Sequence, residues 1–458
     1  MSRVVGTRAR RVEDPQLLRG AGQFLDDVPC PGVLHAEFVR SPHAHARIRS
    51  IDAQSIASIP GVIAVLAAND LADVLTAPQM PPHFPSDVIP RTAGPYVLAV
   101  DEVCYVGEAV AVVIATSRYL AEDAANLLEV DFEPLAAAVD ARDAVAQGAP
   151  IVRTNLTTNV LYRFKVGYGA VHDVFAAAPH TFRVAMWQHR GVAHPIECRG
   201  ILAQPDPAGR AMTVWASTQM SHQLQGMLVD MLGLTDDEVR VIAPDVGGGF
   251  GTKYAAYPED LAVAAAARKL ARPIKWVEDR REHFMASTPE RDQYWDVQIA
   301  TDRQGRILGI RGGMIHDHGA YTLQGTHVAY NAAVSLAGPY VVPAYELDVQ
   351  CAQTNKTPVL PVRGAGYPQA AFAMERLMDS VAAGLGLDRL PGDEQADDVH
   401  APRLDLVVAR GVVPVGDDGD VRRVEAELAK ITRHRGAVAH GLVDGAPKHV
   451  AHEALLAR

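Results

Sequence analysis

The residues best suited to chemistry lie in a glycine-rich segment, VGGGFGTK at Val246–Lys253. Glycine has no side chain and adopts positive φ freely, so such a run lets backbone amides come close to a bound ligand. A strand is predicted before it at 239–245, and the Ala-rich stretch at 258–271 predicts a helix after it. Strand, glycine loop and helix form the arrangement in which many proteins hold a phosphate-bearing cofactor. A tight turn without a ligand remains the alternative.

Two familiar phosphate-binding motifs do not fit this segment. In the dinucleotide-binding pattern, Gly247 and Gly249 match the first two glycines, but Thr252 stands at the third position. The acidic pair at 278–279 does end the next predicted strand, where that fold holds a ribose hydroxyl. The P-loop pattern fails as well, because Thr252 and not a glycine directly precedes Lys253. An independent NAD-binding dehydrogenase is therefore the least favoured interpretation.

The elements that must position this segment belong to a chain of five parts. A lead-in at 1–19 is followed by a predicted α+β domain at 20–135, a linker at 136–150, longer βα units at 151–388 and an atypical tail at 389–458. Predicted strands lie at 33–41, 62–68, 212–218 and 273–279, with a meander between 294 and 315. Predicted helices lie at 118–130, with Ser117 as N-cap, at 222–234 and at 369–387. The apolar stretch 103–115 predicts one buried strand or a strand pair, since Gly107 and Glu108 interrupt it.

The tail has an unusual composition. Residues 389–458 contain no Phe, Tyr, Trp, Met, Ser, Asn or Cys, and Ile431 is their one isoleucine. A packed core is difficult to specify without aromatic residues and with so little isoleucine. We expect an out-of-frame translation or a degenerate terminus, with a disordered or loosely helical tail as the alternative.

Composition and charge exclude several classes of function. The chain has 458 residues and a formal net charge of −11, which disfavours a nucleic-acid partner because phosphates would be repelled. No run of about 18 apolar residues occurs, so no membrane span is expected. The four cysteines, at 30, 104, 198 and 351, are widely separated and lack metal-ligand spacing. We therefore expect no metal site made by the chain's own side chains, and a reducing cytoplasm.

The glycine-rich segment resembles the GGGFGxK loop in the large subunits of molybdenum hydroxylases, the xanthine dehydrogenase, aldehyde oxidase and carbon monoxide dehydrogenase family. Other segments are similar to the same family in the same order along the chain. They are RVEDPQLLRGAGQFLDDV at Arg11–Val28, VCYVGEAVAVVIATSRYLAEDAANLLEVDFEPL at Val103–Leu135, PIECRG at Pro195–Gly200, WASTQ at Trp215–Gln219, VEDRREHFMAS at Val277–Ser287, DHGAY at Asp317–Tyr321 and RGAGYPQAAFAMERLMD at Arg363–Asp379. The resemblance extends over about residues 11–388 and stops where the tail begins.

The resemblance implies an α+β fold, with an α/β-hammerhead domain followed by the first molybdopterin-binding domain. It also implies a molybdenum–molybdopterin cofactor and allows its cytosine dinucleotide form. FAD and 2Fe-2S clusters would lie on partners, an FAD-binding medium subunit and a 2Fe-2S small subunit. The residues that match the family's cofactor-binding motifs are Gln219, Gly248, Gly249, Phe250, Gly251, Arg363 and Gly364.

Each of these residues has an implied role. Gln219 would donate an uncharged amide N–H to an oxo group on the molybdenum. Phe250 and Gly251 would present backbone amides to the metal's oxygen ligands, and Arg363 would lie with its backbone beside the metal. Weaker candidates, for which we expect structural roles, are His189, Glu197, Asp317 and His318.

Three positions that would face the substrate depart from the family's best-known branches. Tyr254 stands where xanthine-oxidising members have a glutamate, Asn331 where they have an arginine, and Ala365 where they have a stacking aromatic residue. A purine would lose its charged clamp and one stacking face, so xanthine is disfavoured. Gly364 replaces the cysteine of carbon monoxide dehydrogenases, which disfavours a copper-bridged site. Aldehydes and N-heteroaromatic rings remain the expected substrates.

The catalytic residue is unknown. In the family, a glutamate in a second molybdopterin-binding domain removes the proton, and no segment after residue 388 resembles that domain. We therefore expect a truncated subunit that is inactive alone and lacks the second domain. Two alternatives remain open: half of a split enzyme completed by another chain, and a non-enzymatic pterin-binding module.

Overall fold

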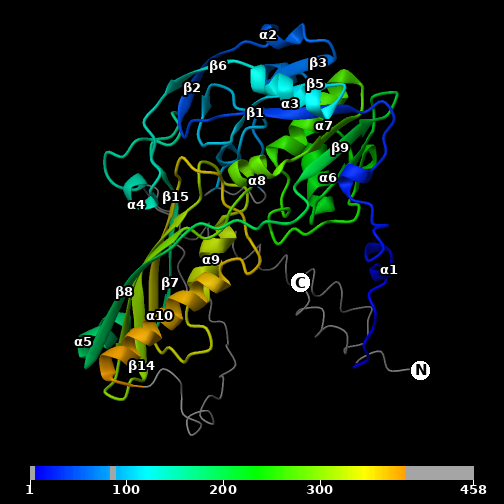
Figure 1. Cartoon of the computed structure of the whole chain (residues 1–458). Coiled ribbons are helices and arrows are strands. Elements are labelled where there is room, and N and C mark those ends of the chain that lie inside the picture. The colour runs from blue at the N-terminus through cyan, green and yellow to red at the C-terminus, as the bar shows by residue number, and fades with distance from the viewer. Residues whose placement is uncertain (1–5, 83–88, 388–458) are drawn as a thin grey trace.

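The computed structural model describes residues 6–82 and 89–387, whose strands form three sheets (Figure 1). The largest sheet has seven strands in the order β11-β10-β9-β12-β1-β5-β3. They are Val239–Ile242 (β11), Met212–Ala216 (β10), Gly200–Pro205 (β9), Ile274–Val277 (β12), Leu34–Arg40 (β1), Ala109–Ala115 (β5) and Val62–Ala67 (β3). The two predicted structured regions share this sheet, because β1 pairs in parallel with β12.

The second sheet has five strands in the order β7-β15-β14-β13-β8. They are Val160–Tyr168 (β7), Tyr345–Ala352 (β15), Ile307–Asp317 (β14), Gln293–Thr301 (β13) and His180–Gln188 (β8). Helices α9 (Thr326–Val334) and α10 (Tyr367–Leu385) run along one face of this sheet, at the lower left of Figure 1. A third, small sheet joins β4 (Glu102–Val103), β2 (Ala46–Ile51) and β6 (Val130–Pro134).

Two helices cover opposite faces of the seven-stranded sheet at β5. The sequence of this strand, AVAVVIA, is buried throughout. Ala111 and Val113 pack with α3 (Arg118–Leu127), whereas Val112 and Ile114 belong to the core around α7 (Pro258–Leu270). Successive side chains of a strand point to opposite faces, so a strand between two helices is apolar at every position. The other α-helices are α1 (Asp14–Leu17), α2 (Gln54–Ala57), α4 (Ala141–Ala144), α5 (Val171–Ala177), α6 (Ser221–Leu232) and α8 (Arg280–Ala286).

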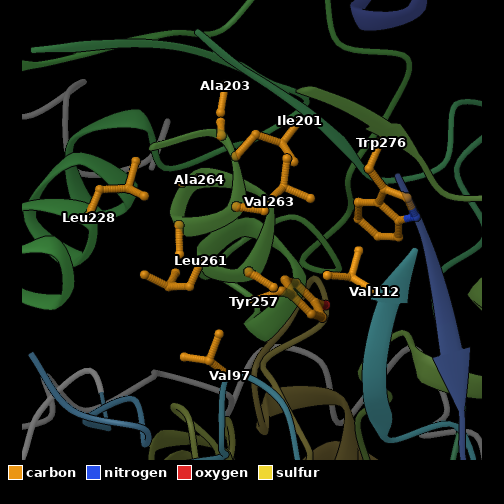
Figure 2. Close-up of a cluster of buried hydrophobic side chains, with 14 of the residues drawn as sticks. Val97, Val112, Ile201, Ala203, Leu228, Tyr257, Leu261, Val263, Ala264 and Trp276 are labelled. Carbon is orange, nitrogen blue, oxygen red and sulfur yellow. The ribbon is translucent and has the colours of Figure 1, made fainter. Parts of the chain in front are cut away.

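Helix α7 forms the centre of the largest core. Its Ala-rich sequence is buried from Pro258 to Ala267, since small side chains allow it to lie close to β9 and β12. Figure 2 shows side chains of these strands and of β5 gathered around the helix, among them Ile201, Ala203, Trp276 and Val112. The helix begins at Pro258, a few residues after the glycine-rich segment, and its start is capped because the Asp260 carboxylate accepts a hydrogen bond from the N–H of Tyr257 at 2.9 Å.

The pairing of β10 with β11 brings Gln219 to the glycine-rich segment. These strands are parallel neighbours, with Met212 opposite Val239 and Trp215 opposite Ile242. Their carboxyl ends therefore lie at the same edge of the sheet, where the chain continues into Gln219 after β10 and into the glycine-rich segment after β11. Ligands of open α/β sheets bind at such an edge.

Most predicted elements are present within a few residues of their expected bounds. The N-cap predicted at Ser117 is confirmed, since its side chain accepts a hydrogen bond from the N–H of Leu120. The apolar stretch 103–115 contains two strands, β4 and β5, which belong to different sheets. The tail at 389–458 lies outside the described residues. No helix in the described part is both long and apolar enough to cross a membrane.

Candidate cofactor site

Gln219 and the glycine-rich segment form one hydrogen-bonded unit. The backbone N–H of Gln219 donates to the carbonyl of Lys253 at 2.9 Å, and its side-chain Oε1 accepts from the N–H of Gly251 at 3.0 Å. Within the described residues, nothing accepts a hydrogen bond from Gln219 Nε2. The oxygen end of the amide is thus used to hold the loop, and the nitrogen end is left as a donor.

Close packing explains why glycine occupies two positions of the segment. A Cβ at Gly249 would collide with Gln219 Oε1, and a Cβ at Gly251 would collide with the carbonyl of Pro361. Between these glycines, Phe250 has a left-handed φ of 56° and a side chain that is 44% exposed. Such a conformation costs a bulky residue on the order of 1–3 kcal/mol. The fold therefore holds Phe250 in a strained conformation that exposes its ring.

A second loop begins at Arg363 and packs against the first. The N–H of Arg363 donates to the carbonyl of Phe250 at 2.8 Å, and its guanidinium lies 5.3 Å from the centre of the Phe250 ring. Gly364 and Ala365 have positive φ values of 111° and 44°. Asn331 of α9 stabilises this turn, because its Nδ2 donates to the carbonyl of Ala365 at 2.8 Å. Residues far apart in sequence thus meet at one place.

The two loops carry hydrogen-bond donors without acceptors in the described part of the chain, and we call them the donor-rich surface. They are the backbone N–H groups of Gly248, Gly249 and Phe250, Nε2 of Gln219 and the guanidinium of Arg363. Unpaired donors at close spacing suit a group rich in anionic oxygen and sulfur atoms. A molybdenum–molybdopterin group offers oxo, thiolate and phosphate acceptors, so the residues present fit it.

A buried ion pair lies beneath the segment, and sequence analysis did not identify it. Nζ of Lys253 lies 2.9 Å from Oε2 of Glu197, and the Lys253 side chain is completely buried. Burial lowers the pKa of Lys253, and the Glu197 carboxylate opposes that effect. In the sequence, Lys253 was noted as the last residue of the glycine-rich segment and Glu197 as a structural residue, but nothing paired the two. The signal for a partner would have been an acidic residue near a neighbouring strand, which Glu197 provides just before β9.

The remaining predicted residues occupy different surroundings. Tyr254 is half-buried at the end of the segment, where its N–H donates to the carbonyl of Gly251 at 3.0 Å. Asp317 is buried in the second sheet and accepts hydrogen bonds from Thr354 Oγ1 at 2.6 Å and Lys356 Nζ at 2.8 Å. Burial lowers the pKa of the neighbouring His318 well below its usual value. Neither Asp317 nor His318 has a hydrogen bond to the donor-rich surface within the described structure.

Comparisons with known protein families identify both regions of the chain. Residues 152–391 match the molybdopterin cofactor-binding domain, and residues 19–136 match the α/β-hammerhead domain of aldehyde oxidase and xanthine dehydrogenase. The chain belongs to the family of molybdenum hydroxylase large subunits. The predicted order of a hammerhead domain and a molybdopterin-binding domain is confirmed.

Individual relatives differ in how much of their length this chain covers. The chain is 37% identical over 383 residues to the nicotine 6-hydroxylase large subunit of Paenarthrobacter nicotinovorans, covering 83% of this chain and 46% of that protein. It resembles the crystal structure of quinoline 2-oxidoreductase from Pseudomonas putida 86 with a TM-score of 0.78 and 33% identity, over 85% of this chain and 49% of that one. The nicotinate dehydrogenase large molybdopterin subunit of Eubacterium barkeri is 29% identical over 396 residues, covering 84% of this chain and 87% of that protein. The chain thus spans about half the length of the first two and most of the third.

Proposed function

We propose that the donor-rich surface holds a molybdenum–molybdopterin cofactor in an enzyme that hydroxylates a ring carbon of an N-heteroaromatic compound. Aldehydes are the second candidate substrates. The observation that carries this proposal is the convergence of unpaired donors from the glycine-rich segment, Gln219 and Arg363. When bound, the cofactor supplies the two-electron oxidation chemistry.

The chain's own residues would bind and orient this group. The N–H groups of Gly248, Gly249 and Phe250 and the Gln219 amide are uncharged donors, which bind anionic oxygen without adding positive charge. Arg363 adds one positive charge, and its stacking on the Phe250 ring limits where the guanidinium can lie. Gly364 follows Arg363 with a φ of 111°, and a Cβ there would collide with the ring of Pro368.

We infer that the general base is not one of the residues of the donor-rich surface or the carboxylate beneath it. The carboxylate that contacts the glycine-rich segment is Glu197, and its Oε2 already accepts hydrogen bonds from Ser217, Gly247 and Lys253. All three donors meet at this one oxygen, so the carboxylate serves to hold the segment in place. We infer that the chain is inactive alone and that proton removal depends on a residue outside the described part.

The residues proposed to face the substrate suit a neutral ring. The amide nitrogen of Asn331 is used by the carbonyl of Ala365, so it offers no charged clamp to a purine. Ala365 itself presents only a methyl group, and Tyr254 presents a phenol where a purine oxidase requires a carboxylate. The names of the relatives that act on nicotine and quinoline support an N-heteroaromatic substrate for this chain.

We further propose that the chain works in a complex. Relatives named as large subunits support a medium subunit with FAD and a small subunit with 2Fe-2S clusters. The relative named as a large molybdopterin subunit, which this chain covers over 87% of its length, supports completion by a second molybdopterin-binding chain. The cytosine dinucleotide form of the pterin and a cytoplasmic location belong to the same proposal. The free state of all four cysteines supports a reducing compartment.

The test is an activity assay on the chain purified together with the product of the adjacent reading frame, with an electron-accepting dye and isotopically labelled water. We expect quinoline or pyridine rings to gain oxygen from water, and xanthine and carbon monoxide to be left unchanged. Oxidation of xanthine or carbon monoxide alone would contradict the proposed substrate class. Bound molybdenum without activity towards any substrate would instead favour a non-enzymatic pterin-binding module.

A further inference from the structure

We propose that Glu197 and Lys253 form a positioning clamp. The clamp limits the conformations of the glycine-rich segment and thereby determines how firmly the site retains its cofactor. This inference rests on the proposed function, because the clamp affects retention only if the donor-rich surface receives that cofactor. Neither residue belongs to the donor-rich surface itself.

A single carboxylate oxygen holds both ends of the glycine-rich segment. Oε2 of Glu197 accepts from the N–H of Gly247 at 2.7 Å and from Nζ of Lys253 at 2.9 Å. The same oxygen accepts from the hydroxyl of Ser217 at 2.6 Å, on the stretch of chain that leads to Gln219. One atom therefore links the two parts of the donor-rich surface, one after β10 and the other after β11.

Backbone and packing contacts fix the carboxylate in place. The N–H of Glu197 donates to the carbonyl of Gly247 at 3.3 Å, and the N–H of Leu25 donates to Glu197 Oε1 at 3.4 Å. Gly247 must lack a side chain for this approach, because a Cβ there would collide with the Cβ of Glu197. Gly247, the first glycine of the segment, thus leaves space for Glu197, whereas Gly249 leaves space for Gln219.

The buried charge of Lys253 is balanced by the charge of Glu197. The side chain of Lys253 is 0% exposed and that of Glu197 is 16% exposed. Within the described residues, Lys253 Nζ has no other hydrogen-bond partner. Removing the Glu197 charge would leave a buried ammonium unpaired, which is strongly unfavourable, so the loop would move to expose Lys253 to water.

The clamp acts on the donors by limiting the conformations of the chain between its ends. The unpaired amides of 248–250 lie between Gly247 and Lys253. Donors that are ordered before binding hold an anionic group more tightly, since less conformational entropy is lost on binding. A change at either end of the clamp should therefore weaken retention of the cofactor without removing any donor.

Hydrogen exchange on the full chain without cofactor tests the clamp directly. The N–H of Gly251 donates to Gln219 Oε1, and the N–H groups of Thr252 and Tyr254 donate to carbonyls of the segment, so these three amides report on its order. Glu197→Gln and Lys253→Met should each raise their exchange rates by at least about tenfold. The double variant should exchange no faster than the worse single variant, because it leaves no charge unpaired.

Lys356→Met is the matched control. It breaks ion pairs of 2.9 Å with Asp292 and 2.8 Å with Asp317 in the second sheet. We expect it to lower stability and leave exchange in the segment unchanged. In cofactor-loaded preparations, the two single clamp variants should lose molybdenum during dialysis at least about tenfold faster than this control.

Unchanged exchange in both single clamp variants would overturn the clamp. Faster exchange with an unchanged rate of molybdenum loss would overturn its control of retention. Wild-type chain that never binds molybdenum would instead overturn the proposed function, and the exchange rates would still decide whether Glu197 and Lys253 order the segment.

Discussion

At the scale of single residues, Gln219 packs so closely against Gly249 that no side chain fits at this position. A methyl group at Gly249 would lie 2.3 Å from Gln219 Oε1, so the side chain would have to move and lose the hydrogen bond that it accepts from Gly251. Gly249→Ala should therefore reduce the molybdenum bound per chain by about tenfold or more, which corresponds to roughly 1.4 kcal/mol of binding free energy. Gly226→Ala is the control, since a Cβ on this α6 residue meets nothing within 4 Å. Equal molybdenum content in both variants would contradict the role of Gly249.

Buried carboxyl groups give opposite predictions for the dependence of stability on pH. Burial raises the pKa of Glu290 from 4.5 to about 7, although the Arg291 guanidinium, 3.5 Å from its Oε2, opposes this shift. The folded state therefore binds more protons than the unfolded state between these values, and stability falls as pH rises through this range. Removing the charge with Glu290→Gln should stabilise the chain near pH 8 by up to about 3 kcal/mol, and the gain should disappear below about pH 4.5.

Glu278 provides the contrasting case. Burial alone would raise its pKa, but the Arg199 guanidinium and hydrogen bonds from His283 and Arg199 lower it. Its contribution to stability is therefore present above the unfolded pKa and is lost as pH falls through the folded one. Glu278→Gln should destabilise the chain near neutral pH, with a difference that shrinks in acid. Urea unfolding of Glu290→Gln and Glu278→Gln at several pH values measures these trends. If the free energy of unfolding of both variants changed with pH in the same way, the opposite pKa shifts of the two residues would be contradicted.

At the scale of elements, a buried network of charges joins β1 to α7 and β9. Glu259 of α7 accepts hydrogen bonds from Arg40 at 2.8 Å and from Arg199 at 3.1 Å. Both of these salt bridges have side chains that are no more than 5% exposed. Arg199 also stacks on Tyr257, 3.8 Å from the ring centre. The network ties the hammerhead domain to the molybdopterin-binding domain through the shared sheet.

Breaking this network should be costly. Glu259→Gln would leave two buried guanidinium groups short of a counter-charge, which typically costs about 3–5 kcal/mol. Thermal or urea unfolding of the full chain measures this loss. The exposed residue Glu122 of α3 supplies a control, because Glu122→Gln should change the unfolding free energy by less than about 0.5 kcal/mol. If Glu259→Gln lowered the unfolding free energy by no more than Glu122→Gln does, the buried network would not contribute to stability.

The sequence predicted elements better than their pairing. Apolar periodicity and capping residues located β1, β3, α3, α7 and α10, because these are local properties. The pairing of β1 with β12 joins residues near 34 to residues near 274, and no local pattern carries that information. The glycine-rich segment was found from its glycines and its place between a predicted strand and helix, whereas Gln219 was found through motif resemblance. The contacts of Asn331 with Ala365 and of Glu197 with Lys253 depend on tertiary packing, so they required the structure.

At the scale of the whole molecule, the described residues bring unpaired donors from two loops to one surface, and we propose that this surface holds the cofactor. The donor-rich surface explains how the chain would hold an anionic cofactor, and Glu197 is committed to positioning the loop. Hydroxylation would then require a further molybdopterin-binding portion, on this polypeptide or on another chain. This chain covers 46% of one relative and 87% of another, so the chain that would carry the remaining portion is open and retention of the cofactor is a more direct test than activity.

The most direct measurement is the molybdenum and pterin content of the full chain, purified with the product of the adjacent reading frame from a host that makes the cofactor. We expect molybdenum and pterin in equal amounts, approaching one of each per chain, and their loss in Gly249→Ala but not in Gly226→Ala. A well-folded wild-type preparation that contains neither would contradict the central claim.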